Sequence, residues 1–304
     1  MDIVCNIDSN YVKYCIVTLV SLFQNNEKGS IHVHIIADNL ADAEKQLMHE
    51  ELDRFGNQLT FYNAGKEIIA HCPISQESQY ISVATYYRIF LPAILSQSIS
   101  KVLYLDCDLI VEDSIRELWD TDLTGYALAA IEDMSSGNEE YYTRLQYDKK
   151  ESYFNAGVML VNLDYWREHQ VMEKCIQYIQ TYPERLALND QDTLNVVLHN
   201  QWLPLHYKWN MHYYHRKTIM SEQADKEIER WLLTPSIIHY ISCIKPWHPH
   251  CEHPLVGRWY SYLDQTRWKG ERPKKTFKDL FNRYIKPIGY ITGIDKPKYK
   301  KLKH

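Results

Sequence analysis

The chain has 304 residues, of which 45% are hydrophobic and 24% charged, and this composition is ordinary for a soluble globular protein of one large α/β domain or two smaller ones. No stretch reaches the roughly 20 apolar residues of a membrane span. The seven scattered cysteines contain no C-x-x-C pair, which argues against a disulfide framework. The net charge is −5, yet residues 269–304 carry 12 Lys and Arg against three acids, so the remaining body is strongly acidic. An acidic body argues against nucleic acid as a partner.

Short apolar runs alternate with segments of helical periodicity along most of the chain. In chain order we expect a strand at 3–7, a helix at 11–25, a strand at 31–37, a helix at 41–54, a strand at 58–62, a helix at 83–95 and a strand at 101–105. Two strands at 127–131 and 157–161, helices at 164–181 and 190–199, and a strand at 237–241 follow. This alternation predicts a parallel sheet with helices on its faces. The chain starts directly with the first strand and has no basic-then-apolar leader, so we expect a cytoplasmic protein.

The basic segment at 269–304 has a pattern of its own and is expected to form a separate tail after a body at 1–268. Its apolar residues recur at helical spacing beside a cationic face, which is typical of a helix that lies in a membrane interface. We therefore expect reversible binding to an anionic membrane surface. The alternative is a terminal helix that docks on the body and leaves a solvated charged face.

Two carboxylates, Asp106 and Asp108, follow the apolar strand at 101–105. Residues i and i+2 of an extended chain point to the same side, so these carboxylates converge at the carboxyl end of a strand, where open α/β sheets bind ligands. A divalent cation that prefers oxygen, such as Mn²⁺ or Mg²⁺, offsets their repulsion. Taken alone, a D-x-D sequence is common, and the alternative is a solvated turn.

Other polar residues also lie where strands end or helices begin, and each has a plain structural alternative. Asp8 and Asn10 can contact a nucleotide or only cap a helix, and Tyr11 offers a stacking face. Arg88 can orient a carboxylate or form an ordinary ion pair. The runs at 154–158 and 189–192 offer donors and acceptors that suit sugar hydroxyls, or they serve as caps.

Four motifs in this order, YLDCDLIV, YFNAGVMLVNL, NDQDTLN and HYISCIKPWH, resemble the family 8 glycosyltransferases over residues 1 to about 268. The resemblance implies a GT-A type fold, a single nucleotide-binding domain with a mostly parallel twisted sheet flanked by helices. It also implies a bacterial enzyme that transfers galactose or glucose, with retained configuration, from UDP-galactose or UDP-glucose to a saccharide acceptor. Lipooligosaccharide or lipopolysaccharide biosynthesis is the implied setting. A lipid-linked acceptor would account for a basic tail that holds the protein at the inner face of the membrane.

The resemblance also implies roles for individual residues. The metal ligands would be Asp106, Asp108 and His239, and the candidates for chemistry at the transferred hexose are Gln191, Asp192 and Asp133. Tyr80 would line the base and sugar pocket. The implied donor contacts are Asp8, Asn10, Tyr11, Ile81, Val83, Arg88, Asp106, Cys107, Asn155, Asp190, Gln191 and Lys245.

An amide is a poor nucleophile, so Gln191 favours a front-face substitution in which the departing phosphate takes the acceptor proton. Asp192 stays open as a nucleophile or as a structural helix residue. Ser242 and Cys243 depart from the glycine and proline that are usual in the family's last motif, which leaves the geometry of the diphosphate loop open.

Three other interpretations remain open. The chain could be a glucosyltransferase of the same family that acts on a protein-linked or other glycan, or a non-catalytic carbohydrate-binding relative. The cluster His248, His250, Cys251 and His253 has zinc-ligand chemistry but lacks the usual two-pair spacing.

Overall fold

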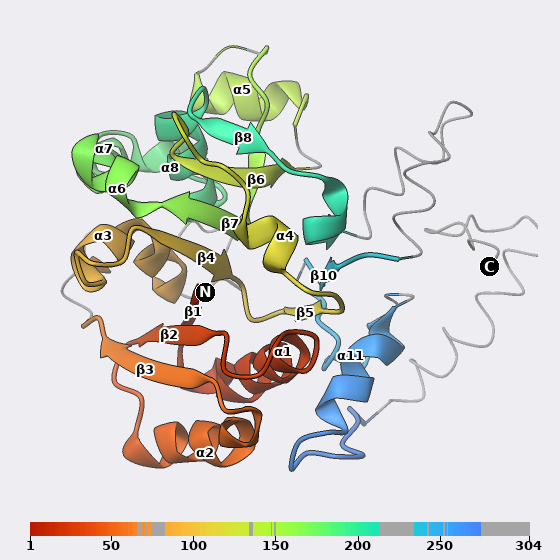
Figure 1. Ribbon diagram of the computed structural model, residues 1–304. Coiled ribbons are helices and arrows are strands. Elements are labelled where there is room, and N and C mark those ends of the chain that lie inside the picture. The colour runs from red at the N-terminus through yellow and green to blue at the C-terminus, as the bar shows by residue number, and fades with distance from the viewer. Residues whose placement is uncertain are drawn as a thin grey trace, which may run out of the picture.

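The computed structural model describes residues 1–65, 69–70, 72–73, 83–133, 136–146, 148, 150–212, 234–241, 243–251, 253 and 255–274. Its main element is a seven-stranded sheet in the order β3-β2-β1-β4-β7-β6-β8 (Figure 1). These strands are β1 Asp2–Ile7, β2 His32–Ala37, β3 Gln58–Asn63, β4 Lys101–Leu105, β6 Leu128–Glu132, β7 Phe154–Asn162 and β8 Trp202–Pro204. All their pairings are parallel except those that β7 makes with β4 and β6. The expected mostly parallel sheet is confirmed.

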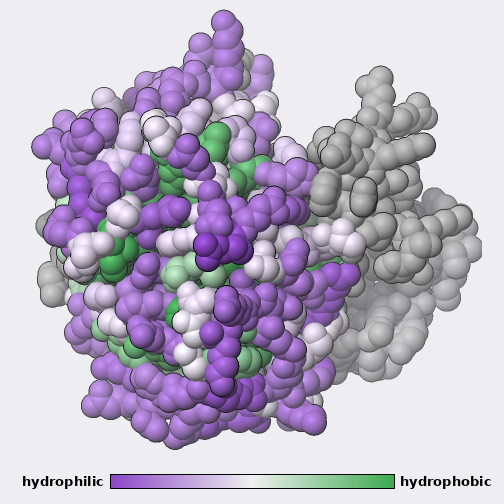
Figure 2. Space-filling model, viewed as in Figure 1, coloured by the Kyte–Doolittle hydropathy of each residue, from purple (hydrophilic) through white to green (hydrophobic). Residues whose placement is uncertain are grey.

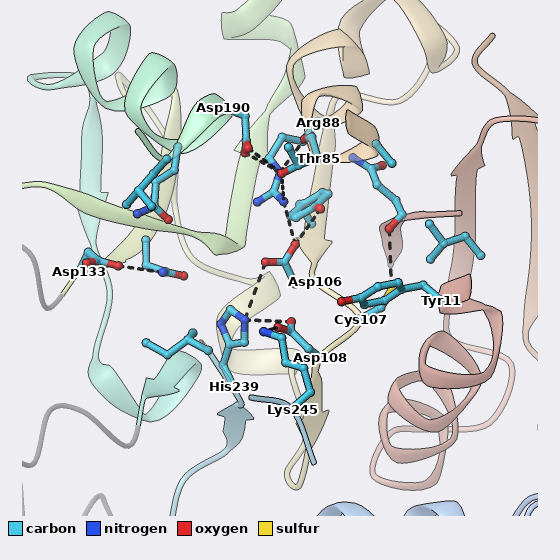
Figure 3. Close-up of a pocket in the computed structure, with 18 of the residues that line it drawn as sticks. Tyr11, Thr85, Arg88, Asp106, Cys107, Asp108, Asp133, Asp190, His239 and Lys245 are labelled. Carbon is cyan, nitrogen blue, oxygen red and sulfur yellow. Dashed lines mark hydrogen bonds and ion pairs between the residues drawn. The ribbon is translucent and has the colours of Figure 1, made fainter. Parts of the chain in front are cut away.

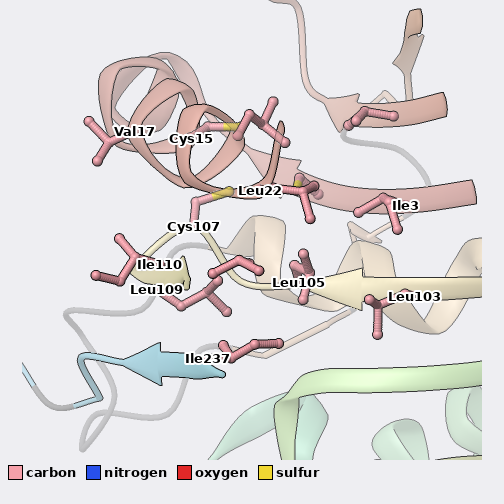
Figure 4. Packing of buried hydrophobic residues seen from close by; sticks show 14 of the residues in the cluster. Ile3, Cys15, Val17, Leu22, Leu103, Leu105, Cys107, Leu109, Ile110 and Ile237 are labelled. Carbon is pink, nitrogen blue, oxygen red and sulfur yellow. The ribbon is translucent and has the colours of Figure 1, made fainter. Parts of the chain in front are cut away.

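The central strands are buried on both faces. Alternate residues of β1 enter different cores, with Ile3 and Cys5 on one side and Val4 on the other. In β4, Leu103 and Leu105 belong to the first core (Figure 4). This two-sided burial explains why these strands are continuous apolar runs in the sequence and do not alternate apolar with polar residues.

Helices cover both faces of the sheet (Figure 1). Their bounds are α1 Val12–Gln24, α2 Asp42–Leu52, α3 Leu91–Ile94, α4 Arg116–Trp119, α5 Glu139–Leu145, α6 Leu163–Glu168, α7 Val171–Thr181, α8 Asn189–Leu198 and α11 Val256–Leu263. The longest, α1, packs its apolar side chains into the same core as Ile3 and Leu105.

Two of the predicted helices are wrong, because each is divided into two elements in the structure. The segment 83–95 is a 3-10 helix, Val83–Phe90, followed by the short α3. Pro92 in the first turn of α3 lacks an amide hydrogen, so a continuous α-helical ladder cannot pass through it. The segment 164–181 breaks into α6 and α7 at Gln170, which takes a left-handed conformation with φ 52°.

A second, three-stranded sheet in the order β5-β10-β9 extends the structure beyond the main sheet. Its strands are β5 Leu109–Val111, β9 Met211–His212 and β10 Ile237–His239. β5 directly follows the D-x-D sequence, and β10 pairs with it antiparallel so that His239 lies opposite Leu109. This pairing brings His239, which comes late in the chain, beside Asp108.

The chain after β10 folds back onto α1 and α2. Trp247 stacks on Tyr14 with ring centroids 3.6 Å apart, and Asn25 donates a hydrogen bond of 2.9 Å to the Tyr262 hydroxyl. Arg267 donates to Glu51 at 2.8 Å. These contacts fix the segment that carries Lys245 to the amino-terminal half of the protein.

In the view of Figure 2 the described surface is mostly hydrophilic, and its apolar side chains form small separate groups. Among the described residues no helix has the length and apolar character to cross a bilayer. The structure describes the tail only as far as Lys274, so the expected amphipathic helix lies outside the described residues.

Candidate active site

A pocket of about 370 Å³ lies at the carboxyl ends of β1 and β4. Asn6 and Ile7 reach it from the end of β1, Asp8 from the turn that follows β1, and Asp106 to Asp108 from the turn after β4. Because β7 runs in the opposite direction, its first residues come to the same end of the sheet, and Asn155 also lines the pocket. The topology therefore collects polar residues from distant parts of the chain at one place.

Asp106, Asp108 and His239 converge in this pocket (Figure 3). One ligand atom of each lies within 4.8 Å of the others. The imidazole Nε2 of His239 is 3.0 Å from Asp108 Oδ1 and 3.8 Å from Asp106 Oδ2. Gly157 makes this approach feasible, because a Cβ there would lie 2.2 Å from His239 Cε1 and 2.7 Å from Asp106 Oδ2.

Basic side chains flank both carboxylates. Arg88 donates to Asp106 at 2.9 Å, and Lys245 forms a very short ion pair with Asp108. Burial opposes ionisation of Asp108, but Lys245 and His239 outweigh it and hold the pKa of that carboxyl well below its usual value. Asp108 is therefore a carboxylate throughout the physiological pH range.

The group fits a divalent cation. Asn210 Oδ1 lies 2.9 Å from His239 Nδ1 and accepts a hydrogen bond when that nitrogen carries the proton. The Nε2 lone pair of His239 then faces two carboxylate oxygens, and three electron-pair donors this close repel one another unless positive charge lies between them. Two carboxylate oxygens and one imidazole nitrogen suit a first-row divalent ion such as Mn²⁺. The metal role of these residues stays a prediction.

Asn210, which contacts His239 behind the pocket wall, was not predicted from the sequence. Its amide also donates to Asn155 Oδ1 at 2.9 Å, and Asn155 in turn donates to Asp133 Oδ2 at 2.8 Å. A continuous chain of hydrogen bonds thus joins Asp133 to His239. No motif surrounds Asn210 in the sequence, so only the fold reveals it.

Asn6 was also missed, and its environment points to a ligand. Both side-chain polar atoms of Asn6 are buried and have no hydrogen-bond partner among the described residues, and the residue lines the pocket. An unsatisfied buried amide costs about 1–3 kcal/mol, which a bound polar ligand can offset. Asn6 is the one polar residue in the apolar run at 3–7, and this was the available signal in the sequence.

A second polar group lies on the other side of Asp106. Arg88 contacts Asp190 Oδ2 at 2.9 Å, and Thr85, also missed, donates to Asp190 Oδ1 at 2.6 Å (Figure 3). Burial raises the pKa of Asp190 to about 6, although Arg88 and Thr85 oppose the shift. Burial likewise disfavours the charged Arg88, but the neighbouring Asp106 and Asp190 raise its pKa overall. Arg88 therefore links the D-x-D pair to the start of α8.

Gln191 and Asp192 have different environments. Gln191 lines the pocket, and its side-chain oxygen accepts from the Ala156 amide at 3.0 Å. Asp192 has no exposed surface and accepts from Tyr153, Arg144 and the Ala187 and Leu188 amides. Of the two roles left open for Asp192, the structure supports the structural one, because both carboxylate oxygens are already bound.

The remaining predicted residues divide into three groups. Tyr11 and Lys245 line the pocket, as does Asp8, which also caps the following turn by accepting from the Asn10 amide. Asn10 is exposed and does not line it. Tyr80 and Ile81 lie outside the described residues, and only the backbone of Val83 is described.

Cys107 lines the pocket but buries its side chain, which is 4% exposed, in the first core (Figure 4). Its sulfur lies with those of Cys5 and Cys15, all within 4.8 Å of one another. A contact between Cys107 and a donor therefore stays a prediction that depends on the backbone. The zinc alternative in the last motif is not supported, because among the described residues His248, His250, Cys251 and His253 do not bring three ligand atoms together.

The model of "Glycosyl transferase family 8" matches residues 2–251. The chain belongs to this family. The expected resemblance is therefore confirmed, and the chain is a glycosyltransferase.

Relatives of this family 8 chain include a stress protein and two lipopolysaccharide glycosyltransferases. It is 31% identical to general stress protein A of Bacillus subtilis, over 88% of this chain and 94% of the relative. It is 28% identical to a lipopolysaccharide 1,2-glucosyltransferase of Escherichia coli, over 97% and 88% of the two chains. A lipopolysaccharide 1,3-galactosyltransferase of Salmonella typhimurium is 27% identical, over 88% and 79%.

The fold matches that of the galactosyltransferase LgtC, solved in complex with donor and acceptor sugar analogues. The TM-score is 0.78 at 28% identity, with 88% of this chain and 96% of LgtC covered. Another LgtC structure carries a glutamine-to-glutamate substitution in its active site and matches equally well. The expected GT-A type architecture of this family 8 chain is thereby confirmed.

Asn210→Ala is expected to raise the Mn²⁺ concentration needed for half-maximal activity about 10- to 100-fold, because His239 loses the group that orients it. Titration of UDP release with Mn²⁺ measures this. Asn138→Ala, which removes only an exposed helix cap, is the control. An unchanged Mn²⁺ requirement in Asn210→Ala would contradict the orienting role.

The raised pKa of Asp190 predicts a pH-dependent effect on stability. At pH values between the unfolded pKa near 3.8 and the folded pKa near 6, the folded state binds more protons than the unfolded state. The ionised carboxyl therefore destabilises the folded protein above pH 6, and this cost disappears as the pH falls. From pH 7 to pH 5 the metal-free wild type should gain about 1 kcal/mol relative to Asp190→Asn. Urea unfolding at both pH values measures the difference, with Asp42→Asn as an exposed control. If the difference in the free energy of unfolding between wild type and Asp190→Asn does not change with pH, the prediction is wrong.

Proposed function

We propose that this family 8 enzyme transfers galactose or glucose from a UDP-hexose to a saccharide acceptor, with Mn²⁺ as cofactor and retention of configuration. The observation that carries the proposal is the convergence of Asp106, Asp108 and His239 within 4.8 Å in a pocket that Lys245 also lines. A bound divalent cation neutralises the charge that develops on the departing diphosphate.

Several of the chain's own residues suit the nucleotide part of the donor. Lys245 is held 3.1 Å from the Tyr240 carbonyl beside Asp108, where its ammonium can exchange the carboxylate for a phosphate oxygen. Tyr11 presents a ring at the pocket wall, and its edge-on contacts with Tyr14 and Trp247 hold that ring in place. Asn6 and Asp8 offer hydrogen-bonding groups beside it, which suits a base and a ribose.

The opposite side of the pocket suits the hexose. Asp133, Asn155, Asp190 and Gln191 line it and present both donors and acceptors to sugar hydroxyls. Asp190 is bound to Arg88 and Thr85, and Asp192 is fully occupied elsewhere. This arrangement favours a front-face substitution, in which the acceptor hydroxyl attacks the anomeric carbon and the leaving phosphate oxygen takes its proton. Gln191, held by Ala156, would orient the hexose.

For the acceptor we propose a growing lipopolysaccharide or lipooligosaccharide chain. Two relatives are lipopolysaccharide glucosyl- and galactosyltransferases, and LgtC, the structural match, is a galactosyltransferase. Such an acceptor is anchored in lipid, and an enzyme that meets it at the cytoplasmic face benefits from a basic surface next to anionic headgroups. We assign residues 1–268 to the transferase domain and 269–304 to this membrane contact.

Released UDP, measured for each of several UDP-sugars with Mn²⁺ and without it, tests the donor and metal assignments. We expect turnover of UDP-galactose or UDP-glucose that EDTA abolishes. Asp108→Asn should reduce turnover at least about 100-fold and remove the metal dependence of UDP affinity. The reason is that Asp108 is both a proposed metal ligand and the ion-pair partner of Lys245.

The matched control is Asp113→Asn, an exposed carboxylate just beyond β5 that does not line the pocket. It should turn over like the wild type. The metal assignment fails if Asp108→Asn keeps the wild-type, metal-dependent affinity for UDP. The transferase assignment fails if the wild type consumes no UDP-hexose.

The tail is tested with vesicles. The full chain should sediment with vesicles that contain anionic lipid and remain in solution with neutral ones, and added salt should release it, because the attraction is electrostatic. A chain that ends at Trp268 should stay in solution in both cases. Equal sedimentation of the two chains would remove the membrane role of the tail.

A further inference from the structure

A cluster of two imidazoles and one carboxylate lies at the opposite end of the sheet from the pocket. Asp2 begins β1, and His32 and His34 lie at the start of β2. The parallel register pairs Asp2 with His32, and His34 is two residues further along, so all three side chains lie on one face. Asp2 and Asp8 are separated by about six residues of extended chain, which corresponds to roughly 20 Å.

The three side chains direct ligand atoms at one another. Asp2 Oδ1 is 3.1 Å from His34 Nε2 and 3.8 Å from His32 Nδ1. One ligand atom of each residue lies within 4.8 Å of the other two. In a tetrahedral zinc site with bonds of about 2.05 Å, neighbouring ligand atoms are about 3.3 Å apart. The cluster therefore needs only small side-chain movements to hold such an ion.

The other nitrogen of each ring is held by a hydroxyl of β3. His32 Nε2 lies 2.7 Å from Thr60 Oγ1, and His34 Nδ1 lies 3.0 Å from the Tyr62 hydroxyl. When these outer nitrogens donate to the hydroxyls, the inner nitrogens present lone pairs toward Asp2. Metal-binding histidines characteristically have their second nitrogen oriented in this way.

The cluster is also accessible. The side chains of Asp2 and His32 are 34% and 33% exposed, whereas that of His34 is 1% exposed. An ion can thus enter from solvent and keep a water as its fourth ligand, while His34 anchors it to the sheet. Two imidazole nitrogens and one carboxylate oxygen favour zinc, nickel, copper or cobalt over Mg²⁺ and Mn²⁺.

We infer that Asp2, His32 and His34 form a second metal site, which binds a borderline divalent transition ion of the zinc class and joins β1 and β2, with β3 supporting both imidazoles. This site is separate from the Asp106–Asp108–His239 group and does not depend on the proposed transferase reaction. An ion bound there stabilises the folded chain by mass action.

The test uses untagged full-length protein, because a polyhistidine tag would bind the same ions. Asp108→Asn serves as the parent, since it weakens the Asp106–Asp108–His239 group. Equilibrium dialysis against Zn²⁺, followed by metal analysis, should give one zinc per chain for this parent. Adding His32→Gln should weaken that binding at least about 10-fold. Adding His49→Gln should not, because His49 pairs with Asp53 and belongs to no group of three ligand atoms among the described residues.

Thermal unfolding provides a second measurement. Zinc should raise the melting temperature of the parent and of the His49→Gln variant but not that of His32→Gln. If His32→Gln does not fold, Asp2→Asn replaces it with the same expected loss. His32→Gln alone should retain wild-type UDP-hexose turnover with Mn²⁺. Equal zinc affinity with and without His32, or no zinc bound by the parent at micromolar concentrations, would overturn the inference.

Discussion

The close approach of two carboxylates and an imidazole is the constraint on which the rest of the site depends. Asp106, Asp108 and His239 place ligand atoms within 4.8 Å of one another, and Asp108 and His239 are buried. Like charges so close together and so poorly hydrated are costly unless cations accompany them. Arg88 and Lys245 supply part of that charge, and we expect a divalent ion to supply the rest.

The topology explains how this arrangement is reached. β1 and β4 are parallel neighbours, so their carboxyl ends lie side by side, and the reversed β7 brings Asn155 and Gly157 to the same end. The small sheet then adds His239 through the pairing of β10 with β5. Gly157 leaves room for the imidazole, and Asn210 orients it. The strand ends, the β5–β10 pairing, Gly157 and Asn210 each fix one part of the site, and the three side chains converge only when all of them are present.

Much of this was predictable from the sequence. The strands at 3–7, 31–37 and 101–105 are short, mostly apolar runs whose central residues are buried, and such runs are typical of strands in the interior of a sheet. The D-x-D pair was identifiable because it directly follows one of them. The helices at 83–95 and 164–181 were drawn too long, because apolar periodicity continues through Pro92 and Gln170 although the backbone changes there.

The residues that the sequence did not reveal share a different property. Thr85 and Asn210 gain their importance from partners far away in the chain, and β8 and β9 are too short for a hydrophobic period to be visible. Their roles arise from tertiary pairing, which no local pattern records.

The late arrival of β10 has a consequence for biosynthesis. A nascent chain can emerge from the ribosome with β1, β4 and β7 complete and still lack His239, Lys245 and the Trp247 ring that stacks on Tyr14. Contacts of such long sequence separation form slowly, because loop-closure entropy must be overcome first. A prematurely terminated polypeptide would therefore contain most of the sheet and the D-x-D pair but would lack the pocket residues His239 and Lys245.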